Sequence, residues 1–170
     1  TLVLEQRVHL NQMLIATKSG KINISKEVDT AGLAKKFSAI LKKGDVVLLY
    51  GEIGVGKTTF IKYLINYFQE KNQSEITEVT SPTFNLINEY VVKDKTFQHF
   101  DLFRLKNKKE IKNIGLFENL KNSITLIEWP QLIKDDIESK IELYFEYESN
   151  LDQRFVIISG LTEADKNVVK

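Results

Sequence analysis

The segment Gly51-Glu-Ile-Gly-Val-Gly-Lys-Thr58 has the composition and spacing of a phosphate-binding loop, or P-loop. In such a loop, successive backbone N–H groups converge on the oxygens of a nucleotide polyphosphate, and the glycines let the backbone come that close. The ammonium group of Lys57 is expected to reach the β- and γ-phosphates, and the hydroxyl of Thr58 to ligate Mg²⁺. The sequence therefore predicts a nucleotide-binding protein.

The residues on either side of this loop have the order that a P-loop requires. Residues 45–50 (Asp-Val-Val-Leu-Leu-Tyr) form an apolar run typical of a buried parallel strand. Residues 59–68 carry apolar side chains at positions 60, 61, 64, 65 and 68, which is helical spacing. Strand, loop and helix N-terminus together would make an anion site, to which the helix dipole adds. A glycine-rich turn with a purely structural role is the alternative.

Hydrolysis of a nucleotide also needs an acid to hold the metal and a group to orient water. Glu128 ends an apolar run at 124–127, where a Walker B carboxylate emerges; a surface acid at a strand end is the alternative. Asp101 is the second candidate, since its aromatic and aliphatic neighbours leave it facing either solvent or the metal. His99 is expected on the same face of the strand as Asp101. A single histidine there is more often a packing residue than a base. Arg104 is a candidate for offsetting phosphate charge, with a plain surface role as the simpler reading.

Two further features lie near the expected nucleotide site. The segment Ser81-Pro-Thr-Phe84 follows the predicted P-loop helix, where a threonine of P-loop switches can sense the γ-phosphate through the metal. A plain proline turn explains the same residues. Trp129 is the only tryptophan and directly follows Glu128, so it would either pack in the core or lie beside the nucleotide.

The remaining patterns predict a mixed α/β sheet, parallel at its centre and flanked by helices, as in P-loop NTPases. We expect Asp29 or Thr30 to cap a helix that runs to about residue 42, and residues 85–92 and 96–103 to form a β-hairpin. Residues 106–121 are charged and either helical or irregular, with a break at Gly115. Further strands are expected at residues 20–25, 123–129, 141–148 and 154–158.

Bulk composition narrows the functional classes. The 170 residues carry a formal net charge of +1, so the overall charge does not demand nucleic acid or an anionic membrane as a direct partner. The absence of cysteine excludes disulfides, thiolate catalysis and cysteine-ligated metals, and it fits a cytoplasmic location. No apolar stretch approaches the ~20 residues of a membrane span. We expect a P-loop domain at residues 20–160, a tail at 161–170 and an N-terminal extension at 1–19, because Met13 could be a native start.

The order and spacing of the motifs resemble the TsaE (YjeE) family of bacterial P-loop ATPases. The motifs are the P-loop, Ser81-Pro-Thr-Phe84, His99-Phe-Asp-Leu-Phe-Arg104 and Ile127-Glu-Trp-Pro130. The resemblance extends from about residue 21 to residue 158. Phe103 replaces the tyrosine that the family carries in its His-x-Asp-Leu-x-Arg block, and the first twelve or so residues have no counterpart in the family pattern.

The resemblance implies an ATPase subunit required for N6-threonylcarbamoyladenosine formation on tRNA next to the anticodon. Members of the family are weak, Mg²⁺-dependent ATP hydrolases that act with the TsaB–TsaD complex. In that complex TsaD performs the transfer, and ATP hydrolysis resets the complex between turnovers. Contact with tRNA would be indirect, through TsaB–TsaD, and no membrane partner is implied.

The resemblance also implies roles for individual residues. Lys57 would bind phosphate, and Thr58 and Glu128 would hold Mg²⁺. Asp101 would support the metal or the attacking water, so that Lys57, Asp101 and Glu128 form the catalytic set. The segment Glu27 to Thr30 would lie near the adenine. The residues expected to bind ATP are Gly51, Glu52, Ile53, Gly54, Val55, Gly56, Lys57, Thr58 and Thr59.

Two other functions stay open at this point. A small P-loop GTPase shares the loop pattern, but it needs an Asp-x-x-Gly switch after the loop and an Asn-Lys-x-Asp guanine reader. Here Asp29-Thr-Ala-Gly32 precedes the loop, and Asn107-Lys-Lys-Glu110 ends in glutamate. In a nucleotide-gated binding module, the ATP state would recruit a partner and hydrolysis would be incidental. The lysines at 106, 108, 109 and 112 are candidates for direct tRNA contact, although a solvated helix face is the usual role of such a run.

Overall fold

A computed structural model describes residues 20–149 and 151–170. At its centre lies a seven-stranded sheet with the order β1-β7-β6-β2-β5-β4-β3. Strands β6, β2, β5 and β4 pair in parallel, whereas β7, β1 and β3 attach through antiparallel pairs toward the two edges. The predicted mixed sheet with a parallel centre is therefore confirmed. The strands are β1 (Lys21–Asn23), β2 (Val46–Tyr50), β3 (Ile87–Val92), β4 (Lys95–Asp101), β5 (Ile124–Glu128), β6 (Ile141–Tyr147) and β7 (Arg154–Ser159).

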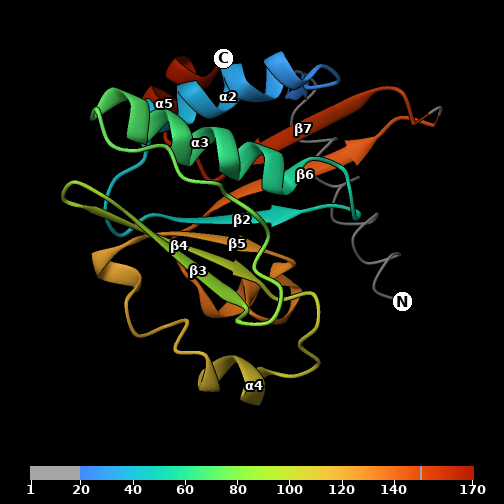
Figure 1. Cartoon of the computed structure of the whole chain (residues 1–170). Helices are drawn as coiled ribbons and strands as arrows, with labels where there is room; N and C mark the ends of the chain where they lie inside the picture. Colours follow the sequence, from blue (N-terminus) through green and yellow to red (C-terminus); the bar gives the residue numbers. More distant parts are fainter. Residues whose placement is uncertain (1–19, 150) are drawn as a thin grey trace.

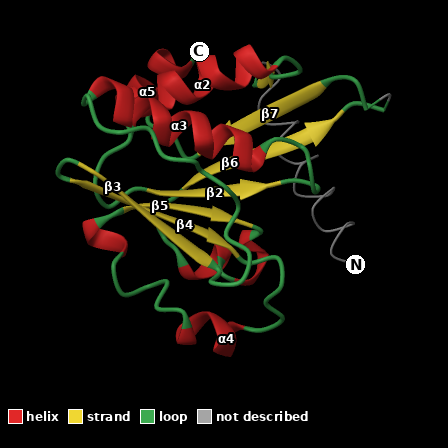
Figure 2. Cartoon of the chain, in the orientation of Figure 1, coloured by secondary structure: helices red, strands yellow, loops and turns green. Residues whose placement is uncertain are grey.

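Helices flank the sheet on both faces. Helices α2 (Glu27–Ile40), α3 (Lys57–Lys71) and α5 (Glu163–Val169) lie together on one face, as Figures 1 and 2 show. Helix α4 (Lys108–Asn113) lies on the other face, with short 3-10 helices at Leu120–Asn122, Pro130–Leu132 and Lys134–Asp136. None of the described helices is long and apolar enough to cross a membrane.

Side chains along β2 point alternately to the two faces of the sheet, so this strand contributes to a hydrophobic core on each face. Val47 and Leu49 are fully buried in the cluster beneath α2 and α3, where Phe37 and Phe60 meet edge to face with ring centroids 5.4 Å apart. Leu48 faces the opposite way, into the cluster that α4 and the 3-10 helices cover. A strand that is buried on both faces needs an unbroken apolar sequence, and residues 46–50 provide one.

Helix α2 begins earlier than its sequence predicted. It starts at Glu27 with Lys26 as the N-cap residue, so the expectation that Asp29 or Thr30 would cap the helix was wrong. The Asp29 carboxylate instead accepts a hydrogen bond from the backbone N–H of Lys26 at 3.3 Å, from one turn inside the helix. An acid in the first turn of a helix can accept a hydrogen bond from a free backbone N–H group, as an N-cap residue does. An acid inside the first turn and an acid at the N-cap are therefore hard to tell apart in sequence.

The segments after α3 follow the expected pattern. Strands β3 and β4 form the predicted hairpin, with the turn at Lys93 and Asp94. Within 106–121, only α4 is α-helical, and the chain turns at Gly115 with φ +68°. Residues 161–170, set apart as a tail, contain α5, where the Lys36 ammonium of α2 donates to the carbonyl of Val169 at 3.1 Å. The proposed extension at 1–19 lies outside the described residues, and the domain boundaries stay a prediction.

Candidate nucleotide site

The P-loop connects the C-terminal end of β2 to the first turn of α3, as the sequence pattern requires. Its glycines adopt backbone angles that favour glycine, with φ +139° at Gly51, +77° at Gly54 and +115° at Gly56. At Gly51 a Cβ atom would also lie 2.6 Å from the carbonyl oxygen of Phe145 on β6. The loop can therefore start in this conformation only with glycine at position 51.

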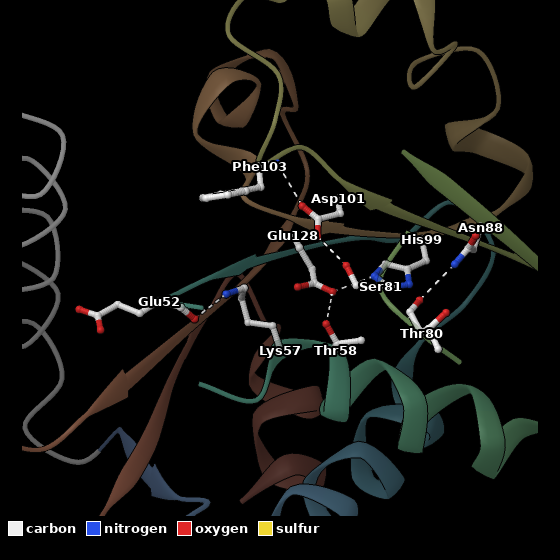
Figure 3. Close-up of polar contacts among 10 residues, drawn as sticks. All are labelled: Glu52, Lys57, Thr58, Thr80, Ser81, Asn88, His99, Asp101, Phe103 and Glu128. Atoms are coloured by element: carbon white, nitrogen blue, oxygen red, sulfur yellow. Dashed lines mark hydrogen bonds and ion pairs between the residues drawn. The ribbon is translucent and has the colours of Figure 1, made fainter. Parts of the chain in front are cut away.

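The loop borders a cleft of about 340 Å³ at the C-terminal ends of β2, β4 and β5. Among the residues predicted from sequence, Gly51, Glu52 and Val55 do not line this cleft. Glu52 is exposed, and Figure 3 shows its carboxylate pointing away from Lys57. The lining residues are Ile53, Gly54, Gly56, Lys57, Thr58, Thr59, Ser81, Pro82, Thr83, Leu86, Asp101, Phe103, Arg104, Glu128 and Trp129.

Lys57 lies at the base of the cleft with only 4% of its surface exposed. Its ammonium donates to the carbonyl oxygens of Gly51 at 2.7 Å and Glu52 at 2.8 Å, and it lies 4.4 Å from the centroid of the Trp129 ring. Burial lowers the pKa of Lys57, although the carboxylates of Glu128, Asp101 and Glu52 act in the opposite direction. An ammonium has three donors, and the carbonyls take two of them, so one remains for an anion.

Glu128 is the acid around which the polar groups of the cleft gather. It is 3% exposed at the end of β5, and its Oε1 accepts hydrogen bonds from Thr58 Oγ1 at 2.8 Å and from His99 Nε2 at 2.8 Å (Figure 3). The structure thus brings together the predicted metal ligands Thr58 and Glu128. It also gives His99, expected to be a packing residue, a direct contact with the acid.

Asp101 lies at the end of β4, paired in register with Glu128. Its Oδ2 accepts a hydrogen bond from the hydroxyl of Ser81 at 2.6 Å, and its Oδ1 accepts one from the backbone N–H of Phe103 at 3.0 Å. The carboxylate therefore ties the segment that begins at Ser81 to the end of the strand. Sequence reasoning placed Ser81 near the site but did not pair it with Asp101.

Aromatic side chains form the outer wall of the cleft. Trp129 packs against Phe103 with ring centroids 4.7 Å apart, and it holds a left-handed backbone conformation with φ +56°. The guanidinium of Arg104 lies 5.7 Å from the ring centroid of Phe84. Trp129 is half-buried: it packs against the core cluster on this face of the sheet and also lies beside the P-loop lysine. Arg104 lines the cleft, but within the described residues it forms no ion pair with Asp101 or Glu128.

The oxygen ligands available in the cleft suit one particular kind of metal site. Among residues 20–149 and 151–170, no group of three or more His, Cys, Asp or Glu side chains is arranged to hold a metal alone. Thr58 and Glu128 offer one hydroxyl and one carboxylate. Mg²⁺ commonly takes few protein ligands of this type and completes its shell with water and substrate phosphates.

Comparison with known proteins identifies the family. The family model described as "Threonylcarbamoyl adenosine biosynthesis protein TsaE" matches residues 24–156. The chain belongs to the TsaE family. Its domain is therefore that of a tRNA threonylcarbamoyladenosine biosynthesis protein, and the resemblance noted in the sequence is confirmed.

Several TsaE proteins are similar in sequence. The TsaE protein of Rickettsia bellii (strain RML369-C) is 45% identical over 111 residues, which cover 65% of this chain and 74% of that protein. The TsaE protein of Rickettsia conorii is 42% identical over 111 residues but is covered over only 61% of its length. The TsaE protein of Haemophilus influenzae is 31% identical over 157 residues, covering 86% of this chain and 92% of that protein.

A solved structure has the same fold as this TsaE family member. The crystal structure of YdiB from Bacillus subtilis superimposes with a TM-score of 0.64 at 25% sequence identity. The match covers 87% of this chain and 89% of that one. The fold class predicted from the sequence, a P-loop type sheet flanked by helices, is thus confirmed by comparison as well as by topology.

Proposed function

We propose that this chain binds Mg²⁺–ATP in the cleft and hydrolyses it, as the ATPase that supports threonylcarbamoyladenosine formation on tRNA. The observation that carries the proposal is the meeting of Thr58 and Glu128 beside the buried ammonium of Lys57. A hydroxyl, a carboxylate and an ammonium group beside a P-loop are groups that phosphoryl transfer requires. Membership in the TsaE family supplies the biological setting.

The residues of the cleft divide the work of binding. Backbone N–H groups of the P-loop and the third donor of Lys57 would bind the phosphates, and glycine at 51, 54 and 56 allows the backbone to approach. Thr58 and Glu128 would hold Mg²⁺, which when bound neutralises charge on the phosphate oxygens. Thr59, next in the helix, lines the same cleft and adds a second hydroxyl.

Asp101 would control the loop above the phosphates. Both of its carboxylate oxygens already accept hydrogen bonds, from Ser81 and from the backbone of Phe103. A carboxylate with these partners would hold the Ser81 segment in register with the metal-binding edge of the sheet. Such a segment is well placed to report the state of the nucleotide to a bound protein.

The partners proposed for this function are the TsaB and TsaD proteins, with tRNA reached only through them, in the cytoplasm. Membership in a family that is described by its part in threonylcarbamoyladenosine biosynthesis supports these partners. The low formal net charge of +1 fits an indirect contact with tRNA.

The deciding experiment measures ATP and GTP turnover by the purified chain, alone and with TsaB–TsaD and tRNA. We expect slow, Mg²⁺-dependent hydrolysis that is specific for ATP and increases when the complex is added. Brisk turnover that ignores the partners, or a preference for GTP, would contradict the proposal. A single turnover followed by a stable complex with TsaB–TsaD would instead favour a nucleotide-gated binding module.

A further inference from the structure

His99 is buried beneath the cleft, with its imidazole against the carboxylate of Glu128. None of its surface is exposed, and its Nε2 lies 2.8 Å from Glu128 Oε1. Thr58 Oγ1 donates to the same oxygen at 2.8 Å, so that two donors from different elements, β4 and α3, share one acceptor (Figure 3). Among the residues that the structure describes, no hydrogen bond reaches the other oxygen, Oε2.

The contact determines which ring nitrogen carries the hydrogen. A carboxylate oxygen only accepts, so Nε2 must be the protonated nitrogen. The other nitrogen, Nδ1, is buried and has no hydrogen-bond partner within residues 20–149 and 151–170. The geometry therefore places a hydrogen on Nε2, directed at the Glu128 carboxylate.

Packing alone does not account for a histidine at this position. Phe97 lies two residues earlier on the same face of β4 and is fully buried as an apolar side chain. An apolar residue at position 99 would fill space without leaving Nδ1 unpaired. The hydrogen bond from Nε2 to Glu128 is the contact that a histidine makes at this position and an apolar residue could not make.

We propose that His99 is a positioning residue for the metal ligand Glu128, an inference that rests on the function proposed above. His99 and Thr58 hold Oε1 as a hydrogen-bond acceptor, and Oε2 is thereby the oxygen presented to Mg²⁺. Carboxylates that bind metals are commonly held in this way by a hydrogen-bonded partner behind them. Removing the imidazole leaves Thr58 to hold Oε1 without His99, so the carboxylate is held less firmly and the metal binds more weakly.

The test measures the Mg²⁺ concentration that gives half-maximal binding of a fluorescent ATP analogue. In His99→Leu, which keeps bulk but has no donor, we expect this concentration to rise about 10- to 100-fold. In His99→Gln, whose amide nitrogen can donate from nearly the same position, we expect a value within about threefold of wild type. Analogue binding in EDTA should be unchanged in both variants.

Phe97→Leu is the matched control, because it alters the same strand face without touching Glu128. A rise in Phe97→Leu equal to that in His99→Leu, or no rise in His99→Leu, would overturn the positioning role. If His99→Leu does not fold, His99→Asn replaces it, since its amide is too short to reach Oε1 and the same loss is expected. Absence of Mg²⁺-dependent binding in the wild type would instead overturn the proposed function itself.

A second readout needs no nucleotide. The ¹⁵N spectrum of the imidazole groups should show a hydrogen on Nε2 of His99, and the Nε2 shift should change in Glu128→Gln. The chain has two histidines, so the signal that disappears in His99→Gln identifies the ring against that of His9. A ring protonated only on Nδ1 would overturn the inference, because a bare Nε2 cannot donate to the carboxylate.

Discussion

Asp101 and Glu128 occupy paired positions on the neighbouring parallel strands β4 and β5. Their carboxylates lie at the same end of the sheet, where β4 and β5 end, but they have different hydrogen-bond partners. Glu128 accepts hydrogen bonds from Thr58 of the P-loop helix and from His99, whereas Asp101 accepts them from Ser81 and Phe103 in the loops above. One acid therefore belongs to the proposed metal site and the other to the segment that covers it.

Replacing Lys57 with methionine should lower ATP affinity about 100-fold, because a charged hydrogen-bond donor to phosphate is lost. The thermal unfolding midpoint should not fall. Burial lowers the pKa of this ammonium from its ordinary 10.5, so its protonation costs stability below that pH, a cost that disappears as the pH rises through the titration range. Calorimetric titration with ATP and a melting curve check both points. Lys62→Met, at an exposed position of α3, is the control, and unchanged ATP affinity in Lys57→Met would contradict the P-loop role.

Replacing Glu128 with glutamine should leave ATP bound but reduce turnover by about 10² to 10⁴, as expected when a carboxylate that holds a metal or a water is lost. Steady-state phosphate release measures this change. Glu142→Gln is the control, because that carboxylate accepts hydrogen bonds from Tyr50 and Tyr144 outside the cleft. Wild-type turnover in Glu128→Gln would transfer the role to Asp101.

Replacing Ser81 with alanine should reduce turnover about tenfold, because the Asp101 carboxylate loses a strong hydrogen bond. The loop that begins at Ser81 should also become more sensitive to a protease. Limited proteolysis and steady-state kinetics on the same preparation test both effects. Thr80→Ala serves as the comparison, since the hydrogen bond from Asn88 reaches the backbone carbonyl of Thr80 and does not involve its side chain. Equal behaviour of the two variants would show that the Ser81 contact has no role.

Tryptophan fluorescence should change when Mg²⁺–ATP is added. Trp129 is the only tryptophan, and its ring lies 4.4 Å from the Lys57 ammonium. A phosphate bound to this ammonium changes the electrostatic field at the indole ring. The Trp129→Phe variant, which should lack the signal, verifies its origin. An emission spectrum that does not respond to Mg²⁺–ATP would leave Trp129 a packing residue.

Replacing Gly51 with alanine should destabilise the fold by about 1–3 kcal/mol through overpacking against the carbonyl oxygen of Phe145. For a chain of this size, the melting temperature falls by about 2–4 °C for each kcal/mol. Gly32→Ala is the opposite case, because it lies inside α2 with no atom near the added methyl group. Gly32→Ala should raise stability by about 1 kcal/mol. A stable Gly51→Ala protein would contradict the steric account.

Local sequence patterns were sufficient for the elements that form the site. The apolar run of β2, the helical spacing of α3 and the acid at the end of β5 each follow from a short stretch of residues, and the structure contains all of them. Because the strand before the P-loop and the helix after it both follow from such local patterns, the position of the loop between them could be predicted as well. Glu128 could therefore be placed near the loop before any coordinates were known.

The contacts between these elements could not be predicted in the same way. The pairing of His99 with Glu128 depends on the register of β4 against β5, which places Leu126 opposite His99 and Glu128 opposite Asp101. A shift of two residues would keep every apolar side chain on its face and separate these groups. The bond between Ser81 and Asp101 depends on the path of a loop, for which hydrophobic periodicity carries no information.

Strand β2, which carries the P-loop, has parallel partners on both of its sides. We therefore expect its amide hydrogens to exchange only when the sheet opens around this strand. The amides of the edge strands β1 and β3 are expected to exchange after local opening alone. If the cleft binds ATP as proposed, we therefore expect ATP to change hydrogen exchange in the loops attached to the end of β2 rather than in the strand itself.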